Sequence, residues 1–225
     1  MIPISVSDEL HEICPNIHLG CIETEVVLQK DHEKLWEQIQ SACEEIEQNL
    51  KSEEISKLYH IANSRKAYKA LGKDPARYRL SAEAMLRRVV KGKGLYKINN
   101  VVDLLNLVSI TTGYSIGGYD ADKIQEQLTF GIGRENEPYE GIGRGTLNIH
   151  CLPTFRDALG ACGTPTSDSV RTSVQDSMKR FLMIIVDFNG QEGLEKTMKI
   201  AMELLQNMAS AQNMESKIVR YEEAQ

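Results

Sequence analysis

The pattern of apolar and polar residues predicts strands at the start of the chain and helices after them. Val and Ile are enriched at residues 2–6 and 17–28 with short polar interruptions, which is typical of β-strands. Apolar residues then recur at helical spacing in four stretches. We expect helices over 35–50 after an N-cap at Asp31, over 53–71 with a stop at Leu71-Gly72, from Ser81 onward, and from Asn99 or Asn100 to Ile110 before Gly113.

The second half of the chain predicts a further β-rich region and one more helix. Glycines are dense between residues 115 and 150, where short apolar runs alternate with turns. Residues 181–188 have the apolar content of a buried strand, and residues 193–211 carry one apolar helical face. The predicted fold class is α+β in one compact unit. We expect residues 1–58 to be an N-terminal β-plus-helix portion integrated with a main domain at 59–225.

Composition narrows the protein class. The chain is 41% hydrophobic and 26% charged, as in ordinary globular proteins. No apolar run approaches the roughly 20 residues of a membrane span, and the first ten residues lack the features of a signal peptide. The five cysteines form no C-x-x-C pair. We therefore expect no membrane association, no metal site and no cofactor, with free thiols in a reducing cytoplasm.

Basic residues gather in one segment of an otherwise acidic chain. Residues 65–97 contain eleven Lys and Arg against the two acids Asp74 and Glu83, a net charge of +9, whereas the whole chain carries −6. Such a segment is either an electrostatic footprint for nucleic acid or a solvated helical face.

The same segment places an aromatic residue between two arginines. Tyr78 lies between Arg77 and Arg79 just past a turn, so the three side chains can stack on bases and bind phosphates, together with Arg65. Alternatively, Tyr78 packs in the core and the arginines pair with nearby carboxylates.

A polar stripe follows the predicted helix near residue 100. Asn99, Asp103, Asn106 and Ser109 recur at spacings of three and four on an otherwise apolar segment. A buried polar group without a partner costs about 1–3 kcal/mol. The stripe is therefore either a structural hydrogen-bond hub or the floor of a polar pocket.

Hydroxyl side chains are dense after Gly163. Five hydroxyls and the Asp168 carboxyl lie within residues 163–172. They predict either a loop and helix cap or the rim of a pocket that binds an anionic or sugar group.

The segments together resemble one family. Residues 98–109 read I-N-N-V-V-D-L-L-N-L-V-S, and Gly113 and Y-D-A-D-K-I at 119–124 follow. This resembles the editing domain, called B3/B4, of the phenylalanyl-tRNA synthetase beta subunit, with I-N-N-V-V-D-V-T-N-Y-V and G-Q-P-L-H-A-F-D-L-D-K-L. Residues 65–79 and 164–172 resemble stand-alone members. The resemblance spans residues 60–190 and implies a B3/B4-like domain with a mixed or antiparallel sheet packed by helices.

The resemblance also implies a function. It implies binding of the acceptor end of aminoacylated tRNA and hydrolysis of a mischarged ester in trans, without tRNA charging. Asn106 would orient the substrate, and Asp187 is a second candidate for catalysis. The substrate would contact Asn106, Gly117, Gly118, Tyr119, Gly163, Thr164, Thr166, Ser167, Asp168, Ser169 and Arg171. The tRNA would be held by Arg65, Arg77, Tyr78 and Arg79.

Two positions depart from the family pattern. Gly117 stands where the family has histidine, and Leu105 stands where it has threonine. We therefore expect a retained pocket with a changed polar lining. This leaves two alternatives to an editing enzyme: a non-catalytic module that binds tRNA or an amino acid, and a small-molecule sensor that reuses the pocket. The oligomeric state has no signature in the sequence.

Overall fold

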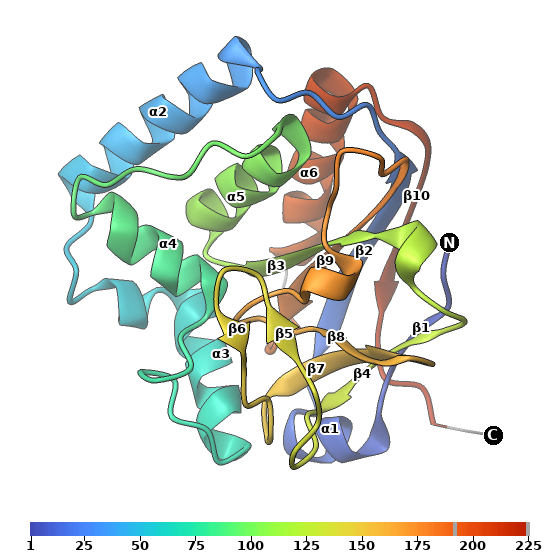
Figure 1. The fold of residues 1–225 in the computed structure, drawn as a ribbon. Coiled ribbons are helices and arrows are strands. Elements are labelled where there is room, and N and C mark those ends of the chain that lie inside the picture. The colour runs from blue at the N-terminus through green and yellow to red at the C-terminus, as the bar shows by residue number, and fades with distance from the viewer. Residues whose placement is uncertain (191–192, 224–225) are drawn as a thin grey trace.

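The computed structural model describes residues 1–190 and 193–223 and has three layers (Figure 1). The middle layer is an antiparallel sheet in the order β10 (Gln212–Val219), β2 (His18–Glu25), β9 (Arg180–Asp187) and β3 (Ser115–Asp120). One face is covered by the helices α5 (Asn100–Thr112) and α6 (Leu194–Ala209), and α2 (Glu33–Asn49) packs on α5. The other face packs on a mixed sheet in the order β1 (Ile4–Val6), β4 (Leu128–Ile132), β7 (Pro153–Asp157) and β8 (Gly160–Gly163). The predicted α+β class is confirmed.

The remaining elements flank these layers. They are α1 (Asp8–Ile13), α3 (Tyr59–Ala70), α4 (Ser81–Val89), the two-residue strands β5 (Glu140–Gly141) and β6 (Gly145–Thr146), and the 3-10 turns η1 (Ile55–Lys57), η2 (Ala121–Lys123) and η3 (Val170–Thr172). Among the described helices, none is long and apolar enough to cross a membrane. Strands from residues 1–58 pair within both sheets, since β1 joins β4 and β2 lies between β9 and β10. The division of the chain at residue 58 stays a prediction.

Several predicted boundaries were wrong. The N-cap of α2 is His32, whose Nδ1 accepts the Leu35 amide at 3.4 Å, and not Asp31. The helix expected over 53–71 begins at Tyr59 after η1. The helix α1 and the edge strand β10 were not predicted. Five of the eight residues of β10 are exposed and two of them are charged, so the strand shows no apolar alternation in the sequence.

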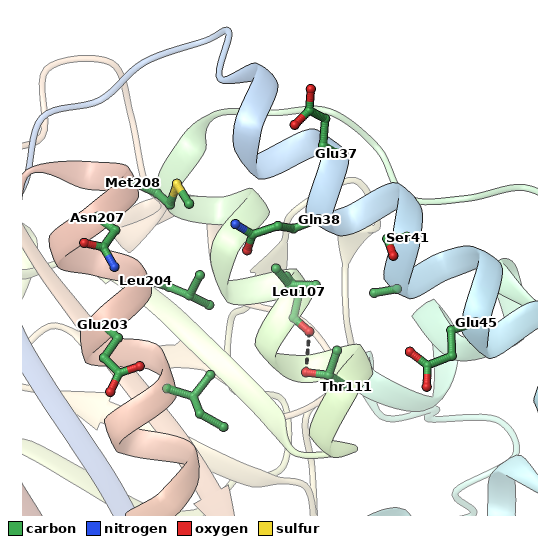
Figure 2. A pocket seen from close by; sticks show the side chains of 12 residues that line it. Glu37, Gln38, Ser41, Glu45, Leu107, Thr111, Glu203, Leu204, Asn207 and Met208 are labelled. Atoms are coloured by element: carbon green, nitrogen blue, oxygen red, sulfur yellow. Dashed lines mark hydrogen bonds between the residues drawn. The ribbon is translucent and has the colours of Figure 1, made fainter.

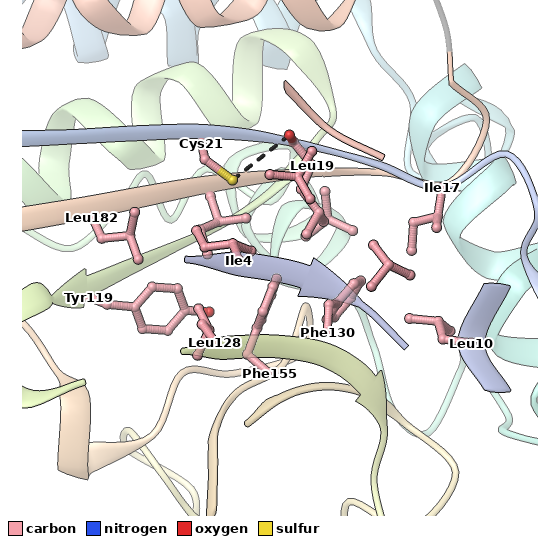
Figure 3. Close-up of a cluster of buried hydrophobic side chains, with 14 of the residues drawn as sticks. Ile4, Leu10, Ile17, Leu19, Cys21, Tyr119, Leu128, Phe130, Phe155 and Leu182 are labelled. Atoms are coloured by element: carbon pink, nitrogen blue, oxygen red, sulfur yellow. Dashed lines mark hydrogen bonds between the residues drawn. The ribbon is translucent and has the colours of Figure 1, made fainter. Parts of the chain in front are cut away.

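Alternation along β2 explains the layers. Leu19 and Cys21 face the mixed sheet, as Figure 3 shows, while Gly20 and Ile22 face the helices. A Cβ on Gly20 would lie 2.9 Å from the Met198 sulfur, so glycine lets α6 pack directly on the strand.

The helical layer is centred on α5. Helices α2 and α6 both pack on α5 and lie on either side of it (Figure 2). The polar stripe on α5 is a hydrogen-bond hub at three of its four positions. Asn99 accepts the Val102 amide at 2.9 Å and Ser109 donates to the Tyr114 carbonyl at 2.6 Å. Asp103 accepts from Trp36 Nε1 and from the Ile98 amide, at 2.9 and 3.0 Å. Asn106 is half-buried, and its side chain hydrogen-bonds to no other described residue.

Asn100, the first residue of α5, connects three segments of the chain. Its side chain is buried, accepts the Gln29 amide at 2.8 Å, and donates to the carbonyls of Val27 and Met208 at 2.9 and 2.8 Å. One amide group thus ties the start of α5 to the end of α6 and to the segment after β2.

We expect Asn100→Ala to lower the free energy of unfolding by at least about 2 kcal/mol, because three buried backbone groups lose their partner at about 1–3 kcal/mol each. Urea denaturation measures this. Asn49→Ala is the control, since that exposed side chain bonds only within α2. Equal effects of the two substitutions would contradict the role given to Asn100.

Candidate functional site

The loop 164–169 closes the outer edge of β3. This strand pairs with β9 on one side, and on the other side the Gly118 amide donates to Asp168 Oδ2 at 3.2 Å. Thr164 Oγ1 accepts the amides of Thr166 and Ser167 at 3.2 and 3.0 Å, which folds the loop on itself. Ser169 Oγ accepts the Arg171 amide at 3.2 Å and caps η3. The loop-and-cap interpretation of these hydroxyls is confirmed.

Tyr119 fills the space between two of the predicted site glycines. Its ring is fully buried, and a Cβ on either Gly117 or Gly163 would lie 2.7 Å from Tyr119 Cζ and closer still to the hydroxyl. The two glycines therefore leave space for a phenol ring, here called the seat, and Tyr119 itself occupies it.

A buried carboxyl group lies beside this phenol. Asp168 as a residue is half-buried, but its Oδ1 is inaccessible and makes no hydrogen bond to another described group. The Tyr119 hydroxyl is in the same state. The two groups are close enough to shift each other's pKa, although no well-formed hydrogen bond joins them. Burial raises the pKa of Asp168 to about 7, and burial together with the Asp168 charge raises that of Tyr119 well above its ordinary value.

A groove of about 550 Å³ lies outside this buried centre. Ser169 and Arg171 are among the residues that line it, with Tyr139, Leu159 and Val170. Their role in binding a substrate stays a prediction. The Tyr139 hydroxyl donates to the Ser167 carbonyl at 2.5 Å, and burial followed by the Asp168 charge raises the Tyr139 pKa. Tyr139 thus lies in the groove wall and near the buried carboxyl group, a role that the sequence did not indicate.

Arg171 is held in place by a carboxylate. Its guanidinium forms two bonds to Asp157, at 2.7 and 3.0 Å. Burial opposes ionisation of Asp157, but Arg171 and the amides of Gln125 and Leu159 outweigh it and lower the pKa. Within residues 1–190 and 193–223, no group of three or more His, Cys, Asp or Glu side chains could hold a metal ion.

Three arginines of the basic segment surround one buried carboxylate. Glu83 accepts two bonds from Arg65, at 2.8 and 3.0 Å, and one from Arg87 at 3.0 Å, while Arg79 Nε lies 3.9 Å away. Of the two alternatives for the arginines, local carboxylate pairing holds for Arg65 and Arg79. Tyr78 is half-buried, with Lys73 Nζ 4.2 Å above its ring.

The other cations of this segment remain on the surface. Seven of them form no ion pair with another described residue; they are Lys66, Lys69, Lys73, Arg77, Arg88, Lys91 and Lys93, here called the cationic surface. Tyr96 is 66% exposed and Arg88 lies 3.8 Å from its ring centre. This pair was not predicted, because an exposed tyrosine has no distinct signature in a sequence.

Helices α3 and α4, which carry Lys66, Lys69 and Arg88 of the cationic surface, contact the loop 164–169. The Tyr68 hydroxyl of α3 and the Thr166 hydroxyl lie 3.0 Å apart, and the Ser81 amide at the start of α4 donates to the Pro165 carbonyl at 2.8 Å. Both helices that carry cations are therefore fixed to the loop that holds Asp168.

Two predicted catalytic residues lie on the helical side of the sheet. Asp187 accepts from the Tyr114 hydroxyl at 3.3 Å, and Tyr114 stacks on His60. It shares a face of β9 with Met183 and Ile185, opposite to the face that meets Tyr119. Asn106 belongs to α5 on that helical side. The structure therefore joins neither residue to the Tyr119–Asp168 centre.

The seat for Tyr119 predicts coupled substitutions. We expect Gly163→Ala and Tyr119→Leu each to destabilise the protein by about 2 kcal/mol or more, through overlap and through a cavity respectively. The double variant should lose less than the sum by at least about 1 kcal/mol, because the smaller side chain leaves room for the new methyl. A double-mutant cycle by urea denaturation measures this, and strict additivity would contradict the seat.

The Asp168 carboxyl predicts a pH dependence of stability. Its folded pKa of about 7 lies above the unfolded value of about 3.9. The contribution of this group to the free energy of unfolding is therefore present at low pH and is lost as pH rises through 7. Relative to wild type, Asp168→Asn should therefore gain stability between pH 4 and 8, on the order of a few kcal/mol at about 1.4 kcal/mol per pKa unit. Unfolding titrations check this, with exposed Asp176→Asn as control. A constant difference across this range would show that Asp168 has an ordinary pKa.

Comparison with known proteins identifies the family. Residues 63–210 match the B3/4 domain family. A comparison with curated proteins gave no match. Among solved structures, one similar chain is an N-terminal fragment of the phenylalanyl-tRNA synthetase beta subunit from Pyrococcus horikoshii, with 13% identity and a TM-score of 0.46. The alignment covers 96% of this chain and 50% of that fragment. Because the family match spans well over half of its residues, the chain belongs to the B3/4 domain family.

Proposed function

We propose that this protein binds tRNA, with the cationic surface on the tRNA backbone and the acceptor end in the groove beside the loop 164–169. The observation that carries the proposal is the cationic surface itself, whose residues lie on or next to α3 and α4, the two helices hydrogen-bonded to that loop. Lys and Arg that lack intramolecular carboxylate partners are available to phosphates. Family membership and the resemblance of residues 98–124 support tRNA as the RNA.

Two cation–aromatic pairs add to this surface. Lys73 lies over Tyr78, and Arg88 lies over Tyr96, which is largely exposed. Aromatic rings and guanidinium planes stack on unpaired bases, at about 1–3 kcal/mol per base. The surface therefore offers contacts to the bases of a single-stranded end as well as to the backbone.

Charge reversal tests the binding. We expect Lys69→Glu with Arg77→Glu to weaken tRNA affinity on the order of tenfold or more, and to lower the slope of log affinity against log salt by about 0.7 per lost phosphate contact. Electrophoretic mobility shift over a salt series measures both. The control is Lys196→Glu with Lys199→Glu on α6, which makes the same change of charge on exposed residues. No binding by wild type, or equal losses in the two variants, would overturn the proposal.

Hydrolysis of a mischarged aminoacyl ester in trans is a second candidate function. The Asp168 carboxyl favours it, because a group with a pKa of about 7 works well as a general base at neutral pH. Asp168 would take a proton from a water that attacks the ester carbonyl; the bond to the tRNA oxygen would break, and that oxygen would leave with a proton. The Tyr119 hydroxyl would donate to the oxyanion. Access requires displacement of Tyr139 or of the loop.

A deacylation assay over a panel of misacylated tRNAs tests this reaction. Asp168→Asn keeps an acceptor for the Gly118 amide but removes the base, so any activity should fall on the order of a hundredfold while binding persists. Asn106→Ala and Asp187→Asn test the two residues that the resemblance implied. Binding without cleavage of any ester would leave the non-catalytic module as the function.

A further inference from the structure

A groove of about 710 Å³ lies between α2 and α6, with α5 as its floor (Figure 2). Both flanking helices pack on α5, and the space between them is open. Its volume is within the range of about 300–1,000 Å³ that is usual for binding pockets. None of these three helices carries the loop 164–169 or the cationic surface.

The two walls of the groove differ in chemistry. The α6 wall presents Ile200, Leu204 and Met208 at steps of four residues, which places them in one row. Ile200 is 37% exposed and the other two are half-buried. This apolar row is left partly exposed to solvent, and methionine in it can adapt to a partner surface.

The α2 wall is polar and acidic. Glu37 and Glu45 lie on it eight residues apart, which is about 12 Å along a helix. Glu203 adds a third carboxylate from α6. No Lys or Arg lines the groove, and none of the three carboxylates pairs with a described cation. The charge of this wall is therefore uncompensated within the described residues.

We propose that the groove is a docking site for an amphipathic α-helix of a partner protein that carries a basic flank. Leu- or Met-like side chains of that helix cover Ile200, Leu204 and Met208. Lys or Arg residues seven or eight positions apart meet Glu37 and Glu45, because that spacing reproduces the separation of the carboxylates. Apolar contact and charge then select the same orientation of the helix.

Synthetic helical peptides of about 18 residues, long enough to span a groove of this length, test the proposal. The panel carries Leu along one face and Lys on the flank at the stated spacing, in both chain directions. Control peptides carry Glu in place of Lys or the same residues in scrambled order. Fluorescence anisotropy should show binding of the basic amphipathic peptides and of neither control set.

Variants of the full chain locate the binding. Glu37→Lys with Glu45→Lys should weaken it on the order of tenfold or more. The matched control, Glu12→Lys with Glu44→Lys, changes the charge equally outside the groove and should have little effect. Leu204→Lys should also abolish binding, with circular dichroism to verify the fold. The proposal is overturned if no basic peptide binds, or if peptide binding survives these groove variants.

Sedimentation velocity over a range of protein concentrations tests whether a second copy of the chain occupies the groove instead. A concentration-dependent dimer that Leu204→Lys dissociates would assign the groove to a second copy of the chain and overturn the partner helix. A monomer at all concentrations, together with peptide binding, supports it. Neither outcome depends on tRNA binding.

Discussion

The hydrogen bond from the Gly118 amide to Asp168 closes a sheet edge, and the rest of the site depends on this closure. An edge strand leaves backbone groups without partners, and buried ones must find them elsewhere. Here a side chain of the loop 164–169 supplies the acceptor for β3. The same loop receives the Ser81 amide and contacts the Tyr68 hydroxyl, so the closure also positions α3 and α4. The loop that holds the buried carboxyl is thereby joined to two helices that carry part of the cationic surface.

The two departures from the family pattern have one physical consequence, which is a filled site. Leu105 packs over Gly118, where a Cβ would lie 2.8 Å from its Cδ1, and covers β3 from the helical side. Tyr119 covers Gly117 from the other side, where the family has a histidine. Both faces of β3 are thus occupied by apolar or aromatic groups of the chain itself. Under the proposed function, a ligand would therefore reach the outer groove first, and the buried centre only after Tyr139 or the loop moved.

The sequence predicted most helices and the buried strand β9, because their apolar periodicity is local. It also selected the hydroxyl-rich loop as a feature, and the structure places that loop at β3. It could not show that Tyr119 fills the space between Gly117 and Gly163, because Gly163 lies more than forty positions from the other two residues. Nor could it divide the basic segment. Whether an arginine pairs with a carboxylate or stays available on the surface depends on tertiary packing. Glu83 is an example, because it pairs with Arg65 and Arg87.

This division of the basic segment limits how RNA can be bound. A buried carboxylate without cations would be strongly destabilising, so the arginines around Glu83 stabilise the fold first. Under the proposed function, the net charge of residues 65–97 would therefore overstate the number of phosphate contacts, and the side chains of the cationic surface would set the upper bound. Charge reversal at Arg65 would disturb both the fold and any RNA contact. At Lys69 or Arg77 it breaks no ion pair, because neither side chain has a described carboxylate partner, although Arg77 also lies 5.7 Å from the Tyr78 ring centre.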